Sequence, residues 1–187
     1  MNQVDAFKES IAEFDRRVRA VPADAWENPT PCSEWDVRAL VNHVTVEALW
    51  TPHLLDGATI ADVGDRYDGD VLGADAVAAW TEAMNSELDA LTGPDVLERT
   101  VNVSWGQISG TDYVSQLTTD HLVHAWDLAK ATTGETELPM ELVQVVYDAA
   151  APIEDMLKST GAFGEKIEAP SDAPLQTRML AVFGRTP

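Results

Sequence analysis

Apolar residues recur at three- and four-residue steps through most of this chain, and this spacing restricts the fold more than any other feature. Such a period aligns apolar side chains along one face of an α-helix and leaves polar residues on the opposite face. A chain built this way must bury several helical stripes against one another. We predict helices over residues 4–18, about 34–55, 74–91, 111–134, about 140–158 and 173–184.

Proline and capping residues divide the pattern into these segments. Three prolines in residues 22–32 indicate an extended or turning connection before the second helix. Ser33 followed by Asp36 resembles a capping box, so we place the start of that helix near residue 34. Pro52 should kink or stop the helix near its end, and Pro152 should kink the helix over 140–158.

The stretch 97–110 does not follow the helical period. Val101, Val103 and Trp105 alternate with polar residues, which predicts a short strand or a small hairpin. All other regular segments are helical, so the expected fold is an all-α or mainly α bundle with about four principal helices. No repeat or shift in composition marks a boundary, and we expect a single domain over residues 1–187.

Composition restricts the partners of this chain. Its formal net charge of -20 opposes binding to nucleic acid and to anionic membranes. No apolar run is long enough for a membrane span, and the N-terminal residues do not resemble a signal peptide. The single cysteine, Cys32, excludes an internal disulfide and fits a reducing compartment. We therefore expect a cytoplasmic protein with no nucleic-acid or membrane partner.

The segment TTDHLVHAWDLA at 118–129 places ionisable residues on a helix face that should be buried. Asp120 and His124 fall between inward-facing leucines, one helical turn apart. A buried carboxylate needs a cation or a hydrogen-bond network, and an acid and a histidine at this spacing suit two ligands of one ion. His43, beside the apolar stripe of the second helix, is the third candidate ligand. Three nitrogen and oxygen ligands leave an open position, as in catalytic zinc sites.

The same residues also have a purely structural interpretation. Asp120 and His124 could form a buried hydrogen-bonded pair, with His43 as a satisfied core histidine. His121 is turned by 100° from Asp120, and His53 follows a helix-breaking proline. We expect each of these two histidines either at the surface or in contact with a metal ligand, without binding the metal itself.

Residues close in sequence to the candidate ligands are expected to pack or to hold the ligands in place. Trp35 and Trp126 are expected to pack, although Trp126 could form the wall of a pocket. Asp127 is expected to hold a metal-binding histidine or to bridge to Arg38. Cys32 is expected to be a structural thiol, because nothing near it in sequence except a helix start would activate it.

Three sequence blocks together resemble a known family. They are TPCSEWDVRALVNHV at 30–44, DHLVHAWDLAKATTG at 120–134 and APLQTRMLAVFGR at 173–185. In this order they are similar to the actinobacterial group of the DinB-like superfamily, whose metal-binding domain resembles the N-terminal part of mycothiol-dependent maleylpyruvate isomerase. The resemblance covers most of the chain, and the first two blocks form its most specific part.

That resemblance implies a fold and a metal site. The fold would be an up-down-down-up four-helix bundle with extra short helices. The metal would be zinc, or alternatively nickel, bound by His43, Asp120 and His124. The isomerase-like enzymes carry glutamate where this chain has Asp120, which would change the reach of that ligand by one methylene. The additional C-terminal domain of the isomerase is not expected within these 187 residues.

Two functions from different classes follow from the resemblance. The first is a metal-dependent transferase or isomerase that joins a small-molecule thiol, such as mycothiol, to a small electrophile. The second is a non-catalytic, stress-related module that binds a metal or a small ligand. A homodimer formed through exposed helix faces is a further alternative, which the sequence does not decide because all six tryptophans are assigned to core positions.

Overall fold

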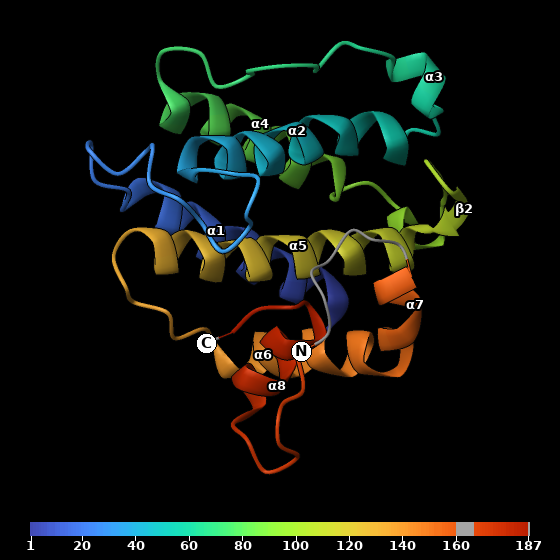
Figure 1. Cartoon of the computed structure of the whole chain (residues 1–187). Coiled ribbons are helices and arrows are strands. Elements are labelled where there is room, and N and C mark those ends of the chain that lie inside the picture. The colour runs from blue at the N-terminus through green and yellow to red at the C-terminus, as the bar shows by residue number, and fades with distance from the viewer. Residues whose placement is uncertain (160–166, 187) are drawn as a thin grey trace.

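Four long helices form the framework of the protein in the computed structural model, which describes residues 1–159 and 167–186. The helix pairs α1 with α5 and α2 with α4 make the most extensive contacts, and α2 also packs on α5 (Figure 1). This arrangement confirms the mainly helical bundle expected from the apolar periodicity. The four helices are α1 (Gln3–Arg19), α2 (Val37–Leu55), α4 (Ala76–Ala90) and α5 (Gly110–Ala131).

Shorter elements surround this framework. The strands β1 and β2 pair as an antiparallel hairpin in which Thr100 lies opposite Ser109, as the alternation in this stretch predicts. Helices α6 and α8 pack against each other on the side of α5 away from α2 and α4. The shorter elements are α3 (Ile60–Val63), η1 (Val96–Glu98), β1 (Thr100–Val103), β2 (Gly106–Ser109), α6 (Met140–Ala150), η2 (Ala151–Ile153), α7 (Glu154–Ser159) and α8 (Leu175–Val182).

The start of α2 differs from the prediction. Its N-cap is Asp36, whose side chain accepts from the Ala39 amide at 2.8 Å, whereas Ser33 lies in the preceding turn. An isolated β-bridge pairs Asp36 with Pro29, which holds Asp36 extended. The helix therefore begins three residues later than expected, because the pairing of Asp36 with a residue seven positions earlier holds the backbone extended up to the cap.

Proline affects two helices differently. Pro52 lies inside the last turn of α2, which continues to Leu55. Pro152 lies in η2, a 3-10 turn that separates α6 from α7. The kink predicted at Pro152 is therefore found, but it is a full interruption that divides the expected single helix into α6 and α7. The connection between α2 and α4 contains one helical turn, α3, that the sequence pattern does not indicate.

Aromatic side chains fill the centre of the bundle. Phe14 and Trp80 meet edge to face with ring centroids 4.9 Å apart, and Trp126 is equally buried on α5. Each such ring removes a large apolar surface from water, which makes this layer a main source of stability. Trp105 is an exception: its residue is 70% exposed at the hairpin turn, so the expectation of a core position for it is wrong.

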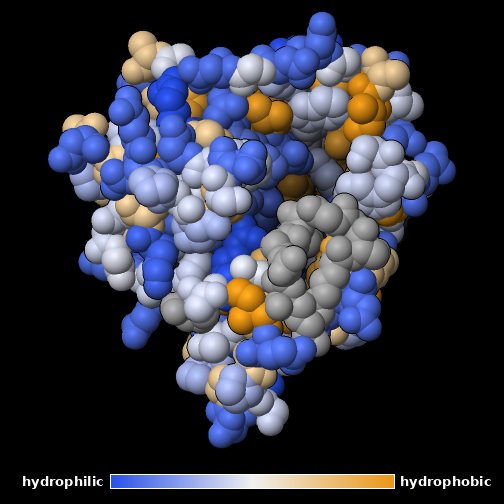
Figure 2. Space-filling view, in the orientation of Figure 1, coloured by the Kyte–Doolittle hydropathy of each residue, from blue (hydrophilic) through white to orange (hydrophobic). Residues whose placement is uncertain are grey.

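The outer surface is largely polar. Figure 2 shows one face on which hydrophilic residues predominate and apolar residues form small separate patches. Within the described ranges, the helices are all too short or too polar to cross a membrane.

Candidate metal centre

Helices α2 and α5 bring His43, Asp120 and His124 together. The Nε2 atom of His124 lies 3.3 Å from Oδ1 of Asp120, and Nε2 of His43 lies 3.7 Å from Oδ2 of the same carboxylate. One ligand atom from each side chain lies within 4.8 Å of the other two. The three residues named from the sequence therefore form one cluster, although their spacing in the chain is 77 and 4 residues.

One carboxylate oxygen in this cluster lacks a hydrogen-bond partner. Oδ2 of Asp120 is buried and accepts no hydrogen bond, although 29% of the side chain as a whole is exposed. A buried acceptor without a partner is costly. Zinc bound tetrahedrally at about 2.1 Å would hold its ligand atoms about 3.4 Å apart. The Nε2 atoms of His124 and His43 lie 3.3 Å and 3.7 Å from the carboxylate, each next to a different oxygen of it. The donor set and the spacing thus fit a small divalent cation.

The ionisation of this cluster follows from its burial and its charges. Burial raises the pKa of Asp120, but the neighbouring His124 and His43 outweigh burial and hold this pKa well below its ordinary value. Burial lowers the pKa of His124, but Asp120, Asp127 and Cys32 together raise it well above 6.5. Without a metal, these shifts favour the ionised form of Asp120 and the protonated form of His124.

The segment before α2 positions His43. The Trp35 ring lies against the His43 imidazole with centroids 4.5 Å apart, and it also approaches the His124 ring at 5.8 Å. Asn28 anchors this segment to the end of α5, because its side-chain amide donates to the Ala131 carbonyl at 3.0 Å. Trp35 packs, as predicted, but it packs on a candidate ligand and forms one wall of the cluster.

A second set of contacts lies behind His124. Its Nδ1 atom is 3.0 Å from Oδ2 of Asp127, which is fully buried and also accepts from the Cys32 thiol at 3.3 Å. Arg185 donates to both carboxylate oxygens of Asp127, through Nε at 3.2 Å and Nη2 at 2.8 Å. Burial raises the pKa of Asp127, but His124 and Arg185 together lower it below its ordinary value. Asp127 therefore holds the candidate ligand His124 in place, which is the first of the two roles expected for it.

The alternative bridge from Asp127 to Arg38 is wrong. Arg38 instead donates to Asp70 and to the Gly73 carbonyl, both at 2.7 Å. The cation beside Asp127 is Arg185, which sequence reasoning missed. Two signals could have indicated it: a buried acid requires a cationic partner, and Arg185 ends the sequence block at 173–185.

His121 belongs to a separate buried pair. Its Nε2 atom lies 3.4 Å from Oε2 of Glu87 on α4, and the two side chains are 1% and 0% exposed. Thr51 donates to the other Glu87 oxygen at 3.2 Å. His121 was expected at the surface or in contact with a metal ligand. It is instead buried, and its described ion-pair partner is Glu87. Glu47 adds a further acid nearby, and its pKa is raised by burial and then by the charge of Asp120.

His53 lies outside the cluster. It is half-buried, and its Nε2 atom is 2.8 Å from the Tyr67 hydroxyl and 3.2 Å from Nη1 of Arg66. Neither partner touches the candidate ligands through any described contact. His53 therefore serves as a useful control histidine.

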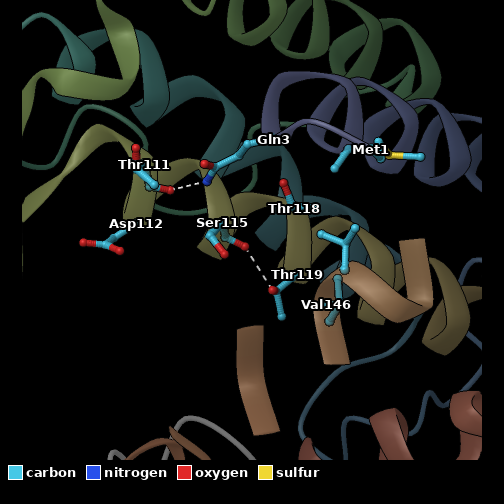
Figure 3. Close-up of a pocket in the computed structure, with 10 residues that line it drawn as sticks. Met1, Gln3, Thr111, Asp112, Ser115, Thr118, Thr119 and Val146 are labelled. Atoms are coloured by element: carbon cyan, nitrogen blue, oxygen red, sulfur yellow. Dashed lines mark hydrogen bonds between the residues drawn. The ribbon is translucent and has the colours of Figure 1, made fainter. Parts of the chain in front are cut away.

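A hollow of about 280 Å³ opens near the N-terminus, between α1, α5 and α6. Figure 3 shows that Gln3 reaches the Thr111 carbonyl across it, and that Thr119 donates to the Ser115 carbonyl. Its lining contains none of the three candidate ligands. Neutral hydroxyl groups and the exposed Asp112 give this hollow no evident reactive chemistry.

Known proteins resemble this chain in sequence and in fold. A family model described as the mycothiol maleylpyruvate isomerase N-terminal domain matches residues 7–129. Two uncharacterized proteins from two strains of Mycobacterium tuberculosis are 29% identical over 192 residues, covering 100% of this chain and 99% of each relative. A crystal structure of a mutant mycothiol-dependent maleylpyruvate isomerase superposes with a TM-score of 0.62 and 16% identity, over 87% of this chain and 72% of the other. At that identity the structural likeness concerns the fold alone.

Proposed function

Because this chain belongs to the family of the mycothiol maleylpyruvate isomerase N-terminal domain, we propose that it is a metal-dependent thiol transferase or isomerase. Its substrates are a small-molecule thiol, with mycothiol as the first candidate, and a small electrophile. The family match and the likeness to a mycothiol-dependent maleylpyruvate isomerase support the thiol. The reducing cytoplasm, where such thiols and Cys32 stay reduced, is the proposed compartment.

The metal in this proposal is bound by His43, Asp120 and His124. The observation that carries the assignment is the buried Oδ2 atom of Asp120, which accepts no hydrogen bond although His43 lies 3.7 Å from it and His124 lies 3.3 Å from the other oxygen. Zinc is the first candidate and nickel the second, because imidazole and carboxylate ligands suit both. A bound divalent cation supplies Lewis acidity that stabilises a thiolate near neutral pH.

The residues of this chain have distinct roles in the proposed reaction. Asp120 and the two histidines bind the cation and do not act as general bases. Trp35 covers one side of His43 and restricts access of water to the cluster. Asp127 holds His124 by its Nδ1 atom, so that the Nε2 atom faces the other two ligands.

Elemental analysis tests the metal assignment. Protein purified without chelator should contain about one equivalent of zinc or nickel, as expected for a single three-ligand site. His43→Ala, Asp120→Ala and His124→Ala should each lose the metal, whereas His53→Ala should retain it. Wild-type protein that stays metal-free after incubation with zinc and nickel would refute the assignment.

A conjugation assay then tests the reaction. The metal-loaded protein should accelerate consumption of mycothiol by members of a panel of small electrophiles, and His124→Ala should not. Metal binding without turnover across the panel would instead favour the non-catalytic metal-binding module. The isomerase-like enzymes are expected to carry glutamate where this chain has Asp120. The shorter ligand would then be one reason for metal binding without turnover.

A further inference from the structure

The imidazole of His124 faces two different sets of metal-ligating groups. Its Nε2 atom points to Asp120 and His43, as described above. Its Nδ1 atom points to Asp127 and Cys32, and ligand atoms of these three residues also lie within 4.8 Å of one another. The second set contains a sulfur, which zinc binds at least as readily as nitrogen or oxygen. Ligand chemistry alone would therefore allow a metal on either side of the ring.

A guanidinium group already occupies the Nδ1 side. Arg185 contacts both oxygens of Asp127, and its Nη2 atom lies 3.1 Å from the Cys32 sulfur. Its Nη1 atom donates to the Phe183 carbonyl at 2.7 Å, which fixes the plane of the group. Arginine keeps its charge at all physiological pH values. A second cation placed between Cys32 and Asp127 would therefore meet a fixed positive charge at contact distance.

The same contacts orient the imidazole. Arg185 fixes the Asp127 carboxylate, and Asp127 accepts from Nδ1 of His124. A histidine that donates one nitrogen to a fixed carboxylate presents the other nitrogen to a metal. Arg185 reaches this place from the segment after α8, and it lies outside residues 7–129, to which the family match extends.

We propose that Arg185 is a positioning residue that assigns the metal to the Nε2 side of His124. It acts as the internal cation of the Cys32–His124–Asp127 set, excludes a metal from that set, and holds the ring toward His43 and Asp120. This inference rests on the proposed metal function. It goes further by stating which of two overlapping ligand sets is used, and which residue decides between them.

Cobalt(II) is a suitable probe, because thiolate ligation produces a sulfur-to-metal charge-transfer band that nitrogen and oxygen ligands do not produce. Wild-type protein should bind Co²⁺ without this band. Arg185→Met should gain the band, because the Cys32 set becomes available, and the double variant Arg185→Met with Cys32→Ser should lose it again. Arg185→Met should also bind Co²⁺ at the original site roughly 10- to 100-fold more weakly, the usual effect of losing a partner of a metal ligand.

Two further variants control for general effects. Arg178→Met removes another arginine of the same C-terminal region, one that contacts Tyr147, and should leave spectrum and affinity unchanged. Arg185→Lys keeps a positive charge but cannot donate to both Asp127 oxygens in one plane. It should bind Co²⁺ more weakly without gaining the band, and it provides the test if Arg185→Met does not fold by circular dichroism.

The outcomes separate this inference from the proposed function. If wild type binds one equivalent of Co²⁺ and both Arg185 variants match it in spectrum and affinity, the role of Arg185 is refuted while the metal function stands. A charge-transfer band in wild type that disappears in Cys32→Ser would also refute the role, because the metal would then lie on the other side of the ring. If wild type binds neither Co²⁺ nor Zn²⁺, both proposals fail.

Discussion

The Nδ1 atom of His124 lies 3.0 Å from Oδ2 of Asp127, and this contact determines which nitrogen the ring presents to the candidate metal centre. An ionised carboxylate only accepts hydrogen bonds, so Nδ1 carries the proton. The opposite nitrogen, Nε2, then faces Asp120 at 3.3 Å. The buried acid three residues after the histidine therefore orients the ring, so that a metal bound by His124 would meet its Nε2 atom.

The charge and the length of the candidate ligand Asp120 give the first prediction. Asp120→Asn keeps the size of the side chain but removes its charge, and should weaken zinc binding at least about 10- to 100-fold, the loss seen even when an outer partner of a ligand is removed. Asp120→Glu keeps the charge, lengthens the side chain by one methylene and should still bind zinc. Titration calorimetry on chelator-treated protein measures both affinities. Equal affinity of wild type and Asp120→Asn would show that Asp120 is no ligand.

The ionised pair predicts how the stability of the metal-free protein depends on pH. The folded-state pKa of His124 is raised above 6.5, so its stabilising contribution is complete below pH 6.5 and is lost as the pH rises through the higher folded value. Each unit of difference corresponds to about 1.4 kcal/mol. The free energy of unfolding in chelator should therefore decrease from pH 6.5 toward alkaline pH.

Asp120 acts at the other end of the pH range. Its folded-state pKa is lowered below 3.8, so its contribution is present above that value and is lost as the pH falls through the lower folded value. Urea unfolding at several pH values measures both effects. In His124→Gln the alkaline decrease should be much smaller than in wild type. An unchanged decrease would show that other groups cause it.

Much of the fold could be predicted from the sequence because its information is local. The helical period and the alternation at Val101, Val103 and Trp105 each need only neighbouring residues. The start of α2 was misplaced by three residues because Ser33 and Asp36 are both possible caps, and the bridge from Pro29 to Asp36 selects Asp36. The exposure of Trp105 was missed for a related reason: alternation predicts a strand but does not say whether its turn is covered.

The candidate site shows the same limit. His43, Asp120 and His124 follow from an acid and a histidine one turn apart, together with a histidine on another apolar face. Asp127 also stood out, but its partner did not, because a helix pattern says nothing about which of several arginines comes close. Arg185 lies 58 residues from Asp127 in sequence, and only the tertiary fold brings them together.

Gly110 provides a prediction about the packing of α5. A Cβ atom there would lie 2.1 Å from the Val96 carbonyl oxygen and 3.1 Å from backbone atoms of Leu97. Backbone cannot yield as a flexible side chain does, so Gly110→Ala should cost about 1–3 kcal/mol or more of unfolding free energy. Gly93→Ala is the control, because its Cβ would lie 2.9 Å from the side-chain end of Arg99 but no nearer than 3.9 Å to backbone, at the Ala90 carbonyl oxygen. Equal stability of the two variants in thermal unfolding would contradict this interpretation.

The buried pair of Glu87 and His121 gives the last prediction. Glu87 connects three helices of the bundle, since it belongs to α4, accepts from Thr51 of α2 and lies 3.4 Å from His121 of α5. Glu87→Ala removes both contacts and leaves the two partners buried without it. We expect a loss of about 3 kcal/mol, the lower end of the cost of breaking a buried pair.

A nearby acid supplies the comparison for this variant. Glu82 is exposed on the same helix, and Glu82→Ala should change the unfolding free energy by no more than about 0.5 kcal/mol. Urea unfolding of both variants should be measured in chelator, so that a change in metal affinity does not enter the comparison. If Glu87→Ala is as stable as Glu82→Ala, the pair does not stabilise the bundle. If Glu87→Ala is stable but lowers the turnover of the proposed thiol reaction, the Glu87–His121 pair would instead serve that reaction.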